Sequence, residues 1–130
     1  MIVLVTGGRD FTDRDLVFRA LDAIHLETPI GLVVHGACGL DDAEAFDWKR
    51  MRGADRCAHE WAAARFVPAK SMPAAWTAFG PAAGPIRNKE MVSFVTAYPE
   101  RMCVAFPGNR GTADCVAKAR RANMRVKEVA

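Results

Sequence analysis

No stretch of this sequence is apolar for long enough to cross a bilayer, and no basic leader with a cleavage-type site begins it. The first apolar residues, Met1 to Val5, instead run directly into a Thr-Gly-Gly turn. A short apolar run that ends in glycines is typical of a buried strand. We therefore expect the chain to begin with a strand and to reside in the cytoplasm.

Cysteine is also scarce, and its four positions are widely separated. Because Cys38, Cys57, Cys103 and Cys115 form no C-x-x-C pair, their spacing argues against a zinc site and favours a reducing compartment. Cys103 falls in an apolar run and is expected in the core. We expect neither a metal nor a cofactor. The net charge of +3 is mild and does not by itself indicate a nucleic-acid partner.

What the chain does contain is the composition of an ordinary globular protein, with 51% hydrophobic and 25% charged residues. Its 130 residues are enough for one hydrophobic core. The sequence shows no internal repeat and no low-complexity tail. We therefore predict a single domain over residues 1–130.

Apolar runs with strand character alternate with segments of helical periodicity along the whole chain. Such alternation predicts a parallel sheet covered by helices on both faces. The predicted fold class is therefore α/β, a Rossmann-like three-layer sandwich with a mostly parallel sheet of about five strands. The expected strands are 2–5, 32–34, 66–67 at a sheet edge, 102–106 and 125–129; the expected helices are 12–25, one from residue 53, 85–97 and 113–122.

A glycine-rich turn, Phe106 to Thr112, follows the late apolar strand. Pro107 ends the strand, while Gly108 and Gly111 permit backbone conformations that other residues resist. Strand, glycine-rich turn and helix form the arrangement in which backbone N–H groups point at an anion. Taken alone, this turn is equally consistent with a simple connection between strand and helix.

A second glycine turn, Thr6-Gly7-Gly8-Arg9, follows the first strand. If the strand order is 3-2-1-4-5, strands one and four are neighbours where the order reverses, and ligands bind at such a point. The two turns would then face each other across one crevice suited to phosphate or pyrophosphate. Arg9 and Arg87 are expected to grip phosphate there, and Asn88 and Thr112 to add neutral hydrogen bonds or caps.

Two segments between these turns have no clear periodicity. Residues 40–52 carry four acidic residues and then three basic ones, with aromatics between them, and predict a short helix or a flap that covers something. A solvated excursion with its aromatics tucked onto the core explains the same pattern. Residues 71–85 are rich in Pro, Gly and Ala and predict a loop anchored by Trp76 and Phe79.

Five short segments carry a family resemblance in the right order: Val5 to Phe11, His35 to Ala37, Arg52 to Asp55 with Trp61-Ala62, Gly84 to Met91, and Phe106 to Asp114. Together they resemble the small stand-alone, YspA-like branch of the SLOG superfamily. That superfamily also holds the Lonely-guy cytokinin phosphoribohydrolases and the DNA-processing DprA proteins. The resemblance implies a Rossmann-like fold, a pocket for a nucleotide or nucleotide-derived ligand, and a homodimer formed through helices.

The chain departs from the family pattern at two places. The family runs from the His-Gly-Ala turn almost directly into Gly-Ala-Asp, whereas here residues 38–51 form an insertion beside the expected pocket. The phosphoribohydrolases have a catalytic Glu where this chain has Cys115. A thiol does not readily replace that carboxylate, so nucleosidase activity should not be carried over. Asp114 and Glu90 are the weak catalytic candidates that remain.

The polar residues near the other turns have favoured structural roles. His35 ends a strand, where a structural hydrogen bond is favoured over general base catalysis. Asp55 begins a helix, where capping is favoured over contact with a ribose or another polar pocket residue. His59 and Glu60 are expected to be exposed without a role. The residues predicted to bind the ligand are Thr6, Gly7, Gly8, Arg9, His35, Gly36, Asp55, Arg87, Asn88, Pro107, Gly108, Asn109, Arg110, Gly111 and Thr112.

Three functions stay open from the sequence. Paired glycine turns with arginines, and no clear nucleophile, base or metal cluster, favour binding or sensing of a nucleotide-derived, phosphate-containing small molecule. The alternative is N-glycosidic hydrolysis of nucleoside monophosphates, with Asp114 or Glu90 in place of the missing Glu. The third is single-stranded DNA binding through the basic residues of 118–127, although such a helix is more often a solvated face.

Overall fold

The computed structural model describes all 130 residues and contains one five-stranded sheet in which every neighbouring pair of strands is parallel. Its strand order is β3-β2-β1-β4-β5, as the sequence predicts. The central neighbours are β1 (Ile2–Thr6) and β4 (Arg101–Ala105), which pair along their full length. The outer strands are β2 (Leu32–His35), β3 (Ala69–Ser71) and β5 (Arg125–Glu128).

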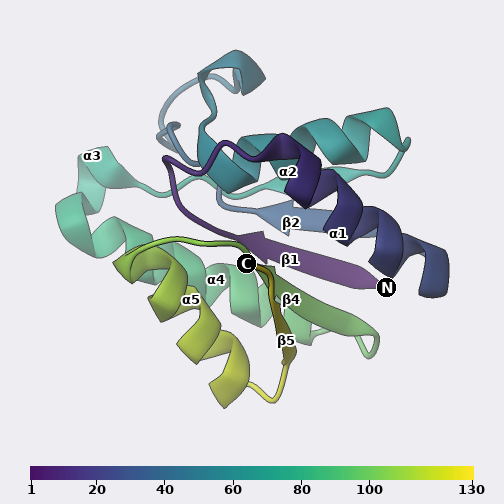
Figure 1. Cartoon of the computed structure of the whole chain (residues 1–130). Helices are drawn as coiled ribbons and strands as arrows, with labels where there is room; N and C mark the ends of the chain where they lie inside the picture. The colour runs from purple at the N-terminus through teal and green to yellow at the C-terminus, as the bar shows by residue number, and fades with distance from the viewer.

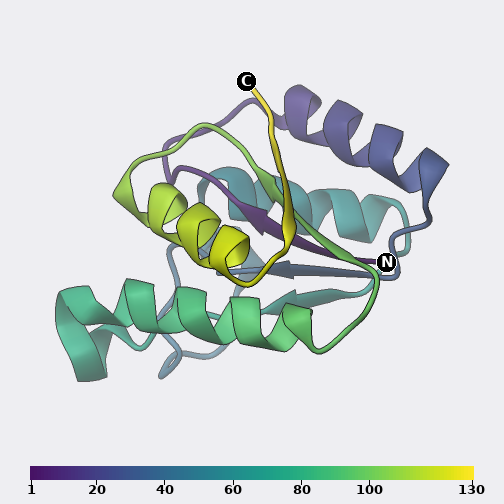
Figure 2. The same cartoon turned by 90° about the horizontal axis from the view of Figure 1, so that it is seen from below.

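Helices cover both faces of the sheet, which confirms the predicted three-layer sandwich. The pair α1 (Arg14–Glu27) and α2 (Gly53–Ala64) lies on one face, and the pair α4 (Ala83–Thr96) and α5 (Arg110–Arg121) lies on the other (Figures 1 and 2). A short helix, α3 (Trp76–Phe79), lies beyond the carboxyl ends of the strands (Figure 1). No helix of the fold combines the length and the apolar character that crossing a bilayer requires.

The core divides into two clusters, because successive side chains of a strand point to opposite faces of the sheet. Val3 and Val5 of β1 join α1 and α2 in a cluster of 17 buried residues around Trp61. Leu4 joins α4 and α5 in a cluster of 10, which includes Cys103 as expected. Each fully buried Val or Leu side chain contributes about 1.5–3 kcal/mol, so these clusters fix the two central strands.

The third strand lies further along the chain than the sequence predicts, and the placement at 66–67 is wrong. Phe66 is 95% exposed with φ 58°, because it turns the chain just beyond α2. Only Val67 of that apolar pair is buried, and pairing with β2 begins at Ala69. Phe66 and Val67, the apolar pair before Pro68, therefore belong to the turn that ends α2 and do not form a strand.

The Pro- and Gly-rich segment is also more structured than predicted. It contains the end of β3, the helix α3, a turn of 3-10 helix (Gly80–Ala82) and the first turn of α4. Trp76 lies against Gly84, but it is 44% exposed, and Phe79 is 56% exposed. The prediction that both rings anchor a loop is therefore wrong for Phe79, which has little of its surface covered.

Candidate functional site

The two glycine turns meet at the carboxyl ends of β1 and β4. The Phe106 N–H donates to the Thr6 carbonyl over 2.9 Å, and the Gly8 N–H donates to the Pro107 carbonyl over 2.8 Å. A Cβ on Gly8 would lie 3.0 Å from that Pro107 oxygen, tighter than most side-chain contacts, so glycine favours this close approach. The turns therefore converge as predicted, but through direct backbone contact, so they form one joined surface.

A third segment, the start of α2, completes this junction. The Ala54 N–H donates to the Gly8 carbonyl over 3.2 Å, and a Cβ on Gly7 would lie 2.5 Å from the Ala54 Cβ. Gly53 has φ 66°, and a side chain there would overlap the Gly8 carbonyl oxygen. Two hollows flank the junction. One of about 500 Å³ borders Pro107, Gly108 and the C-terminal residues 128–130, and one of about 420 Å³ borders Arg9 and the start of α2.

The start of α5 is open to solvent and has no internal cap. Residues 107–111 are exposed, the N-cap Asn109 makes no side-chain bond to the helix, and the first turn holds no acidic residue. By contrast, Asp13 caps α1 by accepting from the Leu16 N–H over 3.1 Å. The first N–H groups of α5 and its positive dipole end are therefore available to an anion.

Asn88 connects α4 to the start of α5. Its amide nitrogen donates to the Gly111 carbonyl over 3.1 Å and to the Asp114 carboxylate over 3.0 Å. Asn88 is buried, so these bonds satisfy a side chain that has no access to water. The amide thus holds the start of α5 against α4.

The two arginines expected at the site lie in different settings. Arg9 is exposed and forms neither an ion pair nor a side-chain hydrogen bond. The Arg87 guanidinium instead donates to the Gly36 carbonyl, and its Nε donates to the Asn88 side chain over 3.0 Å. Arg87 therefore holds the turn after β2 against α4, while Arg9 is free to contact a ligand.

His35 makes structural hydrogen bonds, as the sequence favours, but the sequence did not identify His59 as one of its partners. The Ala37 N–H donates to His35 Nδ1 over 3.0 Å, which leaves the His35 proton on Nε2. Nε2 lies 3.0 Å from Nδ1 of His59. Burial, with the charges of His59 and Arg87, lowers the pKa of His35 to about 3. The prediction that His59 is exposed and without a role is therefore wrong.

Asp55 is buried, and its predicted capping role is wrong. The carboxylate accepts from the Cys38 N–H over 3.1 Å, so it fixes the turn after β2 and leaves the N-cap of α2 without a side-chain bond. Burial raises its pKa to about 6, although the Arg87 charge and the N–H groups of Cys38 and Gly36 act in the opposite direction. Asp55, Arg87 and His35 together therefore form the interior support of this turn.

The candidate catalytic residues on α4 and α5 either make structural contacts or are exposed on the surface. Burial disfavours ionisation of Asp114, but hydrogen bonds from Lys118 and Asn88 outweigh it and lower the pKa. The Lys118 Nζ lies 2.6 Å from the Asp114 carboxylate. The Cys115 thiol is fully buried against Cys103 and Thr6, and Glu90 is exposed on α4.

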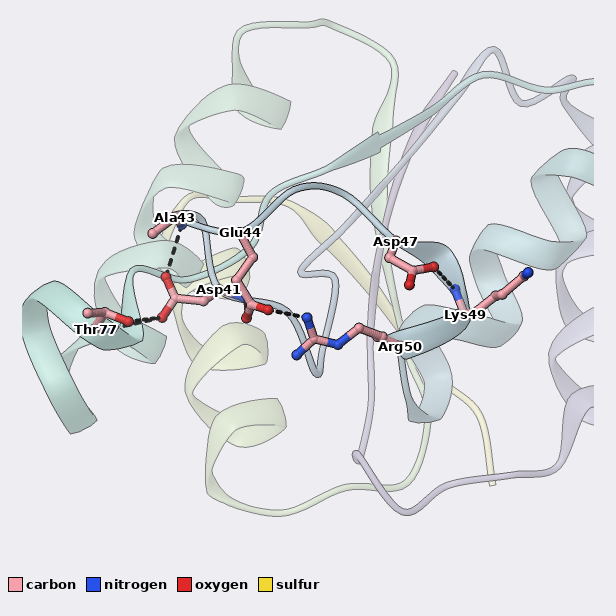
Figure 3. A network of polar contacts seen from close by, with 7 residues as sticks. All are labelled: Asp41, Ala43, Glu44, Asp47, Lys49, Arg50 and Thr77. Carbon is pink, nitrogen blue, oxygen red and sulfur yellow. Dashed lines mark hydrogen bonds and ion pairs between the residues drawn. The ribbon is translucent and has the colours of Figure 1, made fainter.

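Residues 38–52 form an ordered excursion that is bonded to α3. Asp41 is buried and accepts from the Thr77 N–H and hydroxyl over 2.8 and 2.7 Å, and from the Ala43 N–H over 3.0 Å (Figure 3). Further along, Glu44 pairs with Arg50, which begins the return of the chain toward α2 (Figure 3). The excursion therefore has a short helical turn (Trp48–Arg50), as one sequence interpretation expected, and a defined attachment.

Replacing Asp41 with Ala should release this excursion from α3. Three donors lose their acceptor, so we expect several-fold faster proteolytic cleavage within residues 38–52 while the sheet stays folded. The matched control is Asp47→Ala, which removes one exposed bond to the Lys49 N–H. Equal cleavage rates for the two variants would show that Asp41 does not attach the excursion.

Comparison with known proteins agrees with the resemblance seen in the sequence. The family model described as the YspA, cpYpsA-related SLOG family matches residues 1–53, which contain β1, the first glycine turn, α1 and β2. Over 131 residues the chain is 37% identical to the Gene 61 protein of Mycobacterium phage D29, covering 95% of this chain and 92% of the phage protein. The chain therefore belongs to the SLOG family, and this membership supports a nucleotide-related role in binding or processing.

Proposed function

We propose that this protein binds or senses a nucleotide-derived small molecule, with a phosphate group at the start of α5. The observation that carries the proposal is the junction of the two glycine turns through the Gly8 to Pro107 hydrogen bond. It fixes the uncapped start of α5, whose first residue is the exposed Arg110. Backbone N–H groups and an arginine in one place suit a phosphate, and the adjoining hollow of about 500 Å³ has the volume of a small-molecule site.

The state of Asp114 makes binding a better proposal than hydrolysis. A general acid that assists departure of a base must carry a proton, whereas hydrogen bonds from Lys118 and Asn88 lower the pKa of this carboxyl. Its oxygens are also engaged by those two residues. Incubation with nucleoside monophosphates should therefore release no free base, and measurable release would favour the hydrolytic alternative.

Thermal unfolding with nucleotides, ADP-ribose and cyclic dinucleotides tests the binding proposal. At a concentration 100 times its Kd, a ligand stabilises the native state by about 2.7 kcal/mol, a shift of several degrees in Tm. We expect at least one phosphate-bearing compound to give such a shift and the matching dephosphorylated nucleoside to give none. No shift from any of these compounds would contradict the proposal.

Gly111→Glu should remove most of that ligand-induced shift. A side chain at this position meets no atom within 4 Å, and a carboxylate in the first helical turn is favourable to the helix dipole, so the variant should fold. The new charge should repel a phosphate at the same N–H groups. The control is Gly111→Ala, which should raise stability by about 0.5–1 kcal/mol and keep the ligand response. Full binding by Gly111→Glu would place the phosphate elsewhere.

A further inference from the structure

A second hollow, of about 420 Å³, lies between the first turns of α1 and α2 and contains no residue of the α5 start. Four arginines from four segments line it: Arg9 in the β1–α1 turn, Arg14 on α1, Arg52 at the end of the excursion, and Arg56 on α2. The lining also includes Asp10 and Glu60, so its formal charge is four positive groups against two negative groups, or +2. So concentrated a set of guanidiniums indicates an anionic ligand.

Two of the four guanidiniums are held in place by other parts of the protein. Arg14 and Arg56 both pair with the Glu60 carboxylate, over 3.4 and 3.6 Å. Arg14 also lies 4.0 Å over the ring of Phe18, and Arg56 donates to the Lys49 carbonyl over 3.1 Å. These contacts set the positions of the two side chains before any ligand arrives, which lowers the entropic cost of binding.

The guanidiniums of Arg9 and Arg52 have N–H donors that are available to a ligand. Arg9 has no side-chain partner, and Arg52 pairs only with Asp10, over 3.3 Å, in a bridge whose side chains are 54% and 78% exposed. Ion pairs this exposed contribute little, so a phosphate oxygen can replace Asp10 at small cost. A bound anion would therefore gain two new arginine contacts next to two that are already oriented.

We propose that this hollow is a second anion site, which binds a pyrophosphate-class group, meaning two or more linked phosphates. Its volume falls within the range of small-molecule sites and exceeds what one phosphate needs. Its four guanidiniums, each a bidentate donor pair, can contact the oxygens of two linked phosphates at once. This site goes beyond the proposed function, since its arginines come from the β1–α1 turn, α1, the end of the excursion and α2, and the α5 turn takes no part.

The test is calorimetric titration of pyrophosphate and orthophosphate at physiological ionic strength into the Gly111→Glu protein, in which the α5 start is blocked. Pyrophosphate should bind more tightly than orthophosphate. Adding Arg52→Gln should weaken pyrophosphate binding about tenfold, the effect of losing one charge-assisted contact. The matched control is Arg19→Gln, because Arg19 is an exposed arginine on α1 that does not line the hollow.

The outcomes separate this site from the α5 site. If the α5 start binds no phosphate, Gly111→Glu will behave as the unmodified chain does, and the hollow will still bind pyrophosphate. If pyrophosphate fails to bind, or if Arg52→Gln and Arg19→Gln weaken it equally, the proposal is overturned. Because Arg52 contributes only an exposed ion pair, its substitution should leave Tm nearly unchanged, and thermal unfolding checks that the variant is folded.

Discussion

Gly53→Ala should remove about 2–5 kcal/mol from the free energy of unfolding, through backbone strain of about 1–2 kcal/mol and a forced displacement of about 1–3 kcal/mol. Gly53 begins α2 with φ 66°, where a Cβ is disfavoured. A Cβ there would also overlap the Gly8 carbonyl and lie 2.7 Å from the Arg9 Cα. Neither contact ends in a flexible side chain, so the first glycine turn must move. Urea unfolding measures the loss.

Gly80→Ala is the matched control for that prediction. Gly80 has φ 58°, but a Cβ at that position meets no atom within 4 Å. The substitution therefore carries backbone strain without collision, and we expect a loss of about 1–3 kcal/mol. If the two variants lose equal stability, the contact between α2 and the first turn contributes nothing, and the structural account of the junction is wrong.

The Gly53 variant should also lose ligand response at temperatures where it remains folded. The Gly8 carbonyl accepts from the Ala54 N–H, while the Gly8 N–H donates to the Pro107 carbonyl. A shift of Gly8 away from α2 therefore disturbs the bond that joins the two glycine turns. Gly80 lies beyond α3 and touches neither turn, so its variant should keep the full response.

The convergence of the two turns could be predicted because it depends on topology. Alternating strands and helices imply a parallel sheet, and the order 3-2-1-4-5 makes β1 and β4 neighbours whatever their side chains are. Direct backbone contact between the turns could not be predicted. It depends on atoms such as the Gly8 nitrogen and the Pro107 oxygen, and on the start of α2, whose approach no local pattern reveals.

The interior support of the site was missed for a related reason. His35 and His59 are 24 residues apart, and only the packing of α2 on β2 brings Nε2 of His35 to 3.0 Å from Nδ1 of His59. The sequence contains one indication of this arrangement: Asp55 and His59 are four residues apart and therefore lie on the same face of α2. The sequence predicts that Asp55 caps α2, because a carboxylate in the first turn of a helix usually accepts from that helix's own N–H groups. Here the buried carboxylate instead accepts from the Cys38 N–H in the turn after β2.

His35 and Asp55 should make stability depend on pH in opposite directions. The folded pKa of His35 is about 3, below its ordinary 6.5, so the unfolded chain takes up the proton first and stability falls as the pH drops below about 6.5. Burial also lowers the pKa of His59, which adds to this loss. The folded pKa of Asp55 is about 6, above its ordinary 3.8, so the native state binds the proton first and its contribution is lost as the pH rises through about 6.

Asp55→Asn should separate the two effects. The amide oxygen can still accept from the Cys38 N–H, but the side chain no longer ionises. Between pH 4 and pH 7 the raised pKa of about 6 corresponds to about 2 kcal/mol, so the stability of the variant relative to the unmodified chain should be more favourable at pH 7 by that amount. Urea unfolding at both pH values gives this difference. Glu90→Gln, at an exposed position, should show no comparable change. A difference that is the same at both pH values would mean that Asp55 ionises in the folded protein as it does in water.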